Sequence, residues 1–153
     1  MKKILYFLAA LLVCSLSSCQ KELEGTPFVP FDVYLNNTVF HAVCVDNEVI
    51  VKDVELNNLV YHNGDSLYGK IVIDKNEMTP GTNIQKIDCR LGNIVIGTNE
   101  NQFECPFGVR LSDKPIGVHK LSVIIKCKAP DYDQTYWRSD LGLITITDKE
   151  NED

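Results

Sequence analysis

Ser66 stands in the sequence Gly-Asp-Ser-Leu at residues 64–67, where a serine hydroxyl could act as a nucleophile. Such a hydroxyl reacts only when a neighbouring base takes its proton and a third group orients that base. The only histidine after Ser66 is His119, which follows Ile-Gly-Val and has no aspartate three residues before it. The sequence therefore predicts no catalytic residues and a protein that is not an enzyme.

The same four residues resemble the signature of the GDSL esterases, in which the serine is the nucleophile and a late Asp-x-x-His supplies the base. Those enzymes use a parallel sheet with helices, and no ten residues of this chain hold a helical stripe. The esterase stays the least favoured alternative, and a turn that leads into a strand is the simpler interpretation. Asp-Ser-Leu is also similar to the O-glycosylation pattern of Bacteroidota-type exported proteins, which makes Ser66 a candidate glycan attachment site.

Residues 130–138 hold the best group of side chains for ligand binding. Tyrosine and tryptophan offer flat apolar faces with polar edges, which suit stacking on sugar rings or filling a partner's pocket. The candidate ligand-binding residues are Tyr132, Tyr136, Trp137 and Arg138. The simpler interpretation is that Trp137 packs on the core and the tyrosines shield a hairpin, since single exposed aromatic residues are common.

Metal-site spacing is absent from the sequence. The three histidines fall in separate expected elements, and no two cysteines after residue 19 stand at the C-x2-4-C spacing of a zinc site. Asp131, Asp133 and Asp140 carry oxygen ligands of the kind that calcium prefers, but they lack the spacing of an EF-hand. We therefore expect no metal and no cofactor.

Residues 1–18 have the pattern of an export signal, with a basic start, a short apolar run and small residues before Cys19. The apolar run is too short to span a membrane. Leu-Ser-Ser-Cys at residues 16–19 resembles the lipobox of bacterial lipoproteins, which implies cleavage before Cys19 and its acylation, with palmitate as the expected modification. Several acyl chains would anchor the protein permanently. The alternative is a plain secretory peptide.

Residues 19–27 are expected to form a lipidated tether. Residues 20–24 resemble the acidic signal of surface-exposed Bacteroidota-type lipoproteins, although Leu23 interrupts the acids; a solvated linker is the alternative. The resemblance implies a lipid-anchored position in the outer membrane, exposed at the cell surface. Loss of Lys2 and Lys3 with the signal would change the formal net charge from −6 to −8. This argues against nucleic acid as a partner, which would require a basic patch.

From Phe28 onward the hydrophobic pattern has a period of two residues, which predicts strands rather than helices. The β-branched runs cover residues 43–45, 49–51, 67–73, 84–91, 121–127 and 143–147. Turn residues such as Thr-Pro-Gly at 79–81 and Gly-Asn at 92–93 separate them. The pattern predicts one all-β domain, an antiparallel β-sandwich over residues 28–147, followed by a frayed acidic tail at 148–153.

Three landmarks between residues 60 and 147 resemble bacterial immunoglobulin-like domains. They are a strand–turn–strand at 87–98, Pro-Phe at 106–107 and Gly-x-His-x-Leu at 117–121. The resemblance implies an immunoglobulin-like β-sandwich to which residues 28–58 add N-terminal strands at an edge. It also implies that the loop 130–138 joins the last two strands at an end of the sandwich where binding loops cluster.

Four cysteines remain after the leader and the lipid site: Cys44, Cys89, Cys105 and Cys127. An even number in an oxidising compartment favours disulfides, in any of three pairings, over the alternative of four buried, reduced cysteines. In the immunoglobulin-like arrangement, the strand that starts at Pro106 begins at the end where the strand 121–127 finishes. The resemblance thus implies Cys105–Cys127, and by elimination Cys44–Cys89.

These observations predict a lipid-anchored cell-surface binding or accessory module without catalysis. Its partners would be the outer membrane, through the acyl chains on Cys19, and a glycan or protein ligand at the loop 130–138. The alternative from another class is a structural subunit or partner of an outer-membrane assembly, which would bind through sheet edges.

Overall fold

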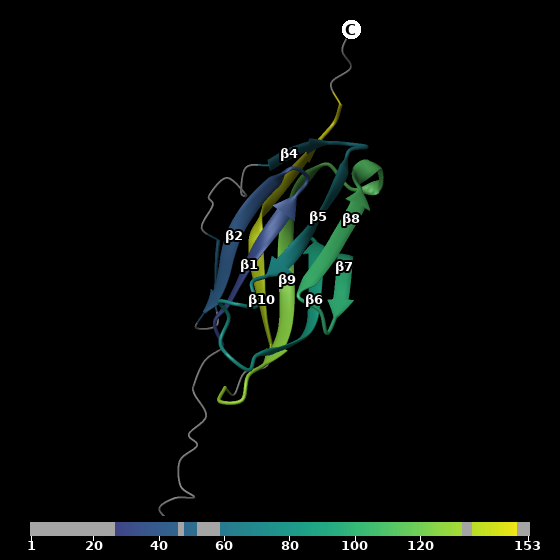
Figure 1. Cartoon of the computed structure of the whole chain (residues 1–153). Coiled ribbons are helices and arrows are strands. Elements are labelled where there is room, and N and C mark those ends of the chain that lie inside the picture. Colours follow the sequence, from purple (N-terminus) through teal and green to yellow (C-terminus); the bar gives the residue numbers. More distant parts are fainter. Residues whose placement is uncertain (1–26, 46–47, 52–58, 133–135, 150–153) are drawn as a thin grey trace, which may run out of the picture.

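The computed structural model describes residues 27–45, 48–51, 59–132 and 136–149. Within these ranges, only the backbone of residues 44–45, 48–51 and 136–139 is described. The described chain forms two five-stranded sheets that lie face to face (Figure 1). It contains no α-helix in these ranges, and no helix that could cross a membrane.

The first sheet has the strand order β3-β2-β1-β5-β8, and every neighbouring pair is antiparallel. Its strands are β1 (Val29–Leu35), β2 (Thr38–Val45), β3 (Glu48–Val51), β5 (Ser66–Ile73) and β8 (Glu104–Arg110). Because β1 and β2 form a hairpin whose first strand pairs with β5, residues 29–51 extend this sheet at one edge, as the sequence predicted.

The second sheet has the order β4-β10-β9-β6-β7. Its strands are β4 (Leu59–His62), β6 (Asn83–Leu91), β7 (Ile94–Glu100), β9 (Gly117–Lys128) and β10 (Tyr136–Thr147). A 3-10 turn, η2 (Leu111–Asp113), lies between β8 and β9. The expectation of an antiparallel sandwich is met except at one edge, where the short β4 runs parallel to β10.

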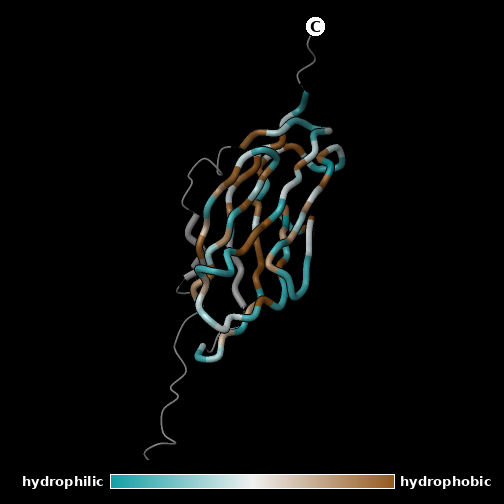
Figure 2. The backbone as a smooth tube through the Cα atoms, viewed as in Figure 1, coloured by the Kyte–Doolittle hydropathy of each residue, from teal (hydrophilic) through white to brown (hydrophobic). Residues whose placement is uncertain are grey.

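Alternation along the strands places the core between the sheets. In β1, Val29, Phe31, Val33 and Leu35 are buried and the residues between them are half-buried. In β9, alternate residues from Leu121 to Cys127 are fully buried. This period-two pattern, visible as brown segments along the strands in Figure 2, is that of two sheets packed through their inner faces.

One end of the sandwich gathers several loops. The chain enters β1 there. The Thr79 amide donates a hydrogen bond to the Phe28 carbonyl at 2.9 Å, and the Phe28 amide donates to the Thr79 hydroxyl oxygen at 2.8 Å. Gly81 faces the ring of Pro130, so the loop after β5 and the loop after β9 lie together. The last strand ends at the opposite end, near β4 (Figure 1).

Candidate ligand-binding pocket

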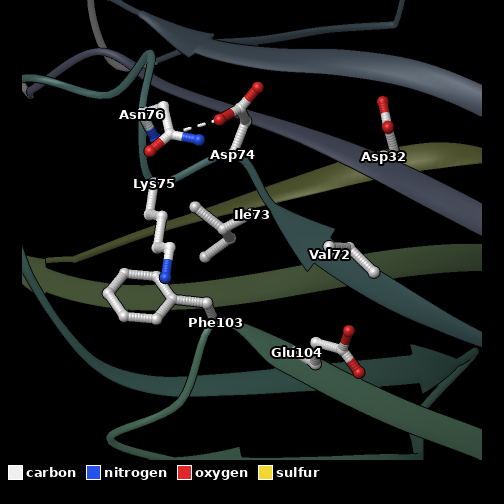
Figure 3. Close-up of a pocket in the computed structure, with 8 residues that line it drawn as sticks. All are labelled: Asp32, Val72, Ile73, Asp74, Lys75, Asn76, Phe103 and Glu104. Atoms are coloured by element: carbon white, nitrogen blue, oxygen red, sulfur yellow. Dashed lines mark hydrogen bonds between the residues drawn. The ribbon is translucent and has the colours of Figure 1, made fainter.

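A surface pocket of about 360 Å³ opens on the outer face of the first sheet, close to the loop end (Figure 3). It is lined by Asp32, Val72, Ile73, Asp74, Lys75, Asn76, Phe103 and Glu104. These residues come from three separate stretches of the chain, so the pairing of β1, β5 and β8 and the loops next to β5 and β8 assemble the pocket together.

Strand register places the floor of the pocket. Asp32 of β1 lies opposite Val72 of β5, and Val72 lies opposite Glu104 of β8. Residues directly opposite each other in antiparallel strands project to the same face of a sheet. The three side chains therefore form one row across the outer face.

The walls of the pocket are held by backbone hydrogen bonds. The Asp74 amide donates to the Pro30 carbonyl at 3.0 Å, and the Ile73 amide donates to the Phe103 carbonyl at 2.8 Å. The Asn76 amide donates to Asp74 Oδ1 at 2.9 Å, the dashed line in Figure 3. This Asx turn and the two backbone hydrogen bonds hold residues 73–76 in place in the absence of a ligand.

Carboxylates dominate the charge of the pocket, with Lys75 as the one cation among its lining residues. Asp32 Oδ1 lies 2.6 Å from His41 Nδ1, and Glu104 Oε1 lies 3.2 Å from the Lys70 ammonium. Both pairs are solvent-exposed and add little stability, but they orient the two carboxylates.

The Phe103 side chain gives the pocket an exposed aromatic surface, because the residue is 36% exposed. Carboxylate oxygens accept hydrogen bonds from hydroxyl groups, and an aromatic ring can stack on the apolar face of a sugar. The arrangement is suited to a neutral or cationic ligand that is rich in hydroxyl groups.

The segment predicted to bind ligands is only partly a loop. Tyr132 is half-buried, and its amide donates to the Ala129 carbonyl at 3.4 Å. Tyr136, Trp137 and Arg138 already belong to β10, where their backbones pair with residues 124–126 of β9. The side chains of these three residues lie outside the described part of the structure.

The turn interpretation of residues 64–67 is confirmed. Gly64 has a φ of 93°, the Asp65 carboxylate accepts the His62 amide at 2.8 Å, and Leu67 is fully buried in β5. Ser66 begins β5 as an exposed residue opposite Arg110. His119 instead contacts the Pro115 carbonyl at 2.6 Å, so these two residues have separate structural surroundings.

The predicted disulfides are absent, since Cys89, Cys105 and Cys127 are buried free thiols. The predicted Cys105–Cys127 pairing was wrong because β8 is an edge strand that faces β6 and β7, whereas Cys127 lies in β9 opposite Ile84. The predicted Cys44–Cys89 bridge is likewise not formed in the structure, where Cys89 is a free thiol. Cys44 lies in β2 opposite Val29, and its side chain is outside the description.

Burial sets the protonation of these thiols. It raises the pKa of Cys127 to about 12. It also raises the pKa of Cys105 to about 11, helped by the negative charge of Asp88 and partly offset by a hydrogen bond from the Cys89 backbone. The pKa of Cys89 rises further, through burial and then through the proximity of Cys105. All three thiols are therefore neutral at pH 7.

Sequence reasoning missed the pocket residues because no local motif marks them. Phe103 follows a polar turn, and Asp32 sits in a strand beside a proline-containing stretch.

Among the residues with described side chains, no three His, Cys, Asp or Glu groups converge as a metal site. The predicted lipid-site residue Cys19 and the predicted leader lie outside the described ranges. Comparison with family models, curated proteins and solved structures gives no match to this chain.

Proposed function

We propose that the chain is an exported, lipid-anchored binding module without catalysis, which takes a hydroxyl-rich ligand such as a saccharide at the loop end of its sandwich. The observation that carries this proposal is the pocket that Phe103 lines together with the carboxylates of Asp32, Asp74 and Glu104. The lipobox at residues 16–19 supports the anchor, and the acidic residues after Cys19 support display on the outer membrane.

An immunoglobulin-like topology is part of the proposal. β5 and β8 are neighbours in one sheet, and β7-β6-β9-β10 follow each other in the other sheet. Immunoglobulin domains of the variable type place their B and E strands, and their C′, C, F and G strands, in these orders. In that correspondence, the loops after β5 and β9 are equivalent to two of the three loops that bind antigen in variable domains.

The position of the tether constrains how a ligand could reach the pocket. The chain enters β1 at the loop end, and residues 19–27 can span at most about 30 Å when fully extended. An acylated Cys19 would therefore keep the pocket near the membrane surface. This geometry favours a saccharide attached to the envelope over a ligand on a distant cell.

Saccharide binding can be tested with the purified full chain on an array of neutral and amino-sugar oligosaccharides, followed by calorimetry. Phe103→Ala should weaken binding of a positive saccharide at least tenfold, since the stacking face is lost. Phe28→Ala is the matched control, because Phe28 is 39% exposed and does not line the pocket.

The outcomes separate three possibilities. Equal affinity of the Phe103→Ala variant and the parent chain would remove the pocket from the proposal. Loss of binding in Trp137→Ala but not in Phe103→Ala would move the site to residues 130–138. No saccharide binding at millimolar concentration would contradict the proposed ligand class and favour a protein partner.

A further inference from the structure

Two buried cysteines from opposite sheets meet in the core. Cys89 lies in β6 of the second sheet and Cys105 in β8 of the first, and neither is exposed to solvent. Cys105 Sγ lies 3.5 Å from the carbonyl oxygen of Ile87, two residues before Cys89. The Cys105 sulfur therefore lies against the backbone of β6 close to Cys89.

A glycine makes this approach possible. Gly97 of β7 lies opposite Cys89, and the β6–β7 register shifts directly after this pair. A Cβ at Gly97 would overlap the Pro106 carbonyl and come within 2.8 Å of Phe107 Cα. Because Gly97 lacks that atom, the backbone of β8 can pack directly against β7 of the second sheet. The residue before Pro106 is Cys105, which is thereby brought to β6.

Cys127 has a different environment. It lies opposite Ile84 in the β6–β9 ladder, and burial alone raises the pKa of its thiol. Cys89 lies opposite Val123, so Cys127 is four residues further along β9, or roughly 13 Å away at about 3.3 Å per residue. The Cys105 sulfur, in contrast, contacts Ile87, two residues before Cys89. Among the three described thiols, Cys89 and Cys105 are thus the neighbouring pair.

We propose that Cys89 and Cys105 form a disulfide that joins the two sheets when the chain folds in an oxidising compartment. A disulfide needs Cα atoms about 4.4–6.8 Å apart. The close approach of β8 to Gly97, the residue opposite Cys89, places Cys105 beside β6 for such a bond. The oxidant is another disulfide, in a thiol oxidoreductase or in oxidised glutathione. The two S–H bonds break, one S–S bond forms, and two protons and two electrons reduce the oxidant to two thiols.

Burial determines when this reaction can occur. The thiolate is the reactive form in disulfide exchange, and both thiols are neutral and shielded once the sheets have packed. The bond must therefore form before β8 closes onto β6. For the same reason, it should resist mild reductants in the native protein and yield to them after unfolding.

Peptide mapping tests the proposal on the parent protein. The full chain is produced with its own leader in a Gram-negative host, and free thiols are blocked with an alkylating reagent in acid-trapped, denatured samples before trypsin is added. Cys89 falls in the tryptic peptide 87–90 and Cys105 in the adjacent peptide 91–110. We expect these two peptides joined and two hydrogens lighter than their sum. Alkylation of both cysteines, or linkage of either one to Cys44 or Cys127, would overturn the proposal.

Thermal unfolding with and without reductant gives an independent measurement. Reduction of the denatured protein, followed by refolding with reductant, should lower the midpoint by about 10 °C relative to the oxidised protein. Cys89→Ala and Cys105→Ala should each abolish this reductant-dependent shift. Cys127→Ala is the matched control, since it removes another buried thiol and should retain the shift. A shift that persists in Cys105→Ala would contradict the pairing.

Discussion

Gly97 lies where β7 of the second sheet packs directly against β8 of the first sheet. A methyl group there would collide with the backbone of β8 at Pro106 and Phe107, and backbone cannot rotate away as a side chain can. Gly97→Ala should therefore lower the free energy of unfolding by about 1–3 kcal/mol. Gly108→Ala is the matched control in β8, where the nearest atom to a new Cβ would be 3.8 Å away. Urea unfolding measures both, and equal stability of the two variants would contradict this close approach.

The buried thiol of Cys127 should make the reduced protein sensitive to alkaline pH. Burial raises its pKa to about 12, so between pH 9 and 12 the folded chain retains a proton that the unfolded chain releases. The stabilisation from the neutral thiol is full below about pH 9 and is lost as pH rises toward 12. Under reductant, the parent protein should lose about 1–2 kcal/mol more than Cys127→Ala between pH 8 and 10.5. Parallel stability curves from urea unfolding would contradict this linkage.

At the scale of strands, β4 and β9 should differ most in local stability. β9 is hydrogen-bonded on both sides by β10 and β6, and its inward residues are fully buried. β4 has four residues, pairs only with β10 and leaves Val60 59% exposed. Edge elements with few buried contacts open before the global transition. Amides of residues 60–62 should exchange with deuterium at least tenfold faster than those of 122–126, with the internal strand β5 as a slow control. Equal rates would contradict this ranking.

Two of the strands that sequence patterning predicted have an environment that repeats every two residues. The run at 67–73 became β5 and the run at 121–127 became the interior of β9, since alternate residues in both point to the core. β4 was missed because four residues are too few to establish a period, and its parallel partner is more than 80 residues away. β8 contains Pro106, which an edge strand tolerates and a central strand does not. The hydrophobic pattern therefore predicted strands inside the sheets, whereas the edge strands β4 and β8 depend on pairing with distant parts of the chain.

At the scale of the whole molecule, the pocket is a product of topology. Asp32, Val72 and Glu104 share a row only because β1, β5 and β8 are consecutive in one sheet. Nothing local to position 32 or 104 indicates that the two carboxylates flank one site. The proposed lipid site, by contrast, is defined by the contiguous residues 16–19, so a short motif is enough to propose it. Local chemistry can be inferred from a sequence more readily than a site assembled from distant strands.

The chain enters β1 at the same end of the sandwich as the pocket. This arrangement predicts how the anchored protein should bind large and small ligands. If Cys19 carries acyl chains, the short tether holds the loop end against the membrane, so large probes are excluded from the pocket while small saccharides enter. Insertion of twelve Gly-Ser residues after Gly25 should therefore increase the binding of a bulky saccharide conjugate to intact cells. The affinity of the purified protein for the free saccharide should not change, because the pocket itself is unaltered. Insertion of the same linker after Lys149, at the opposite end, is the matched control and should leave binding on cells unchanged. An equal response to both insertions, or to neither, would show that the membrane does not cover the loop end.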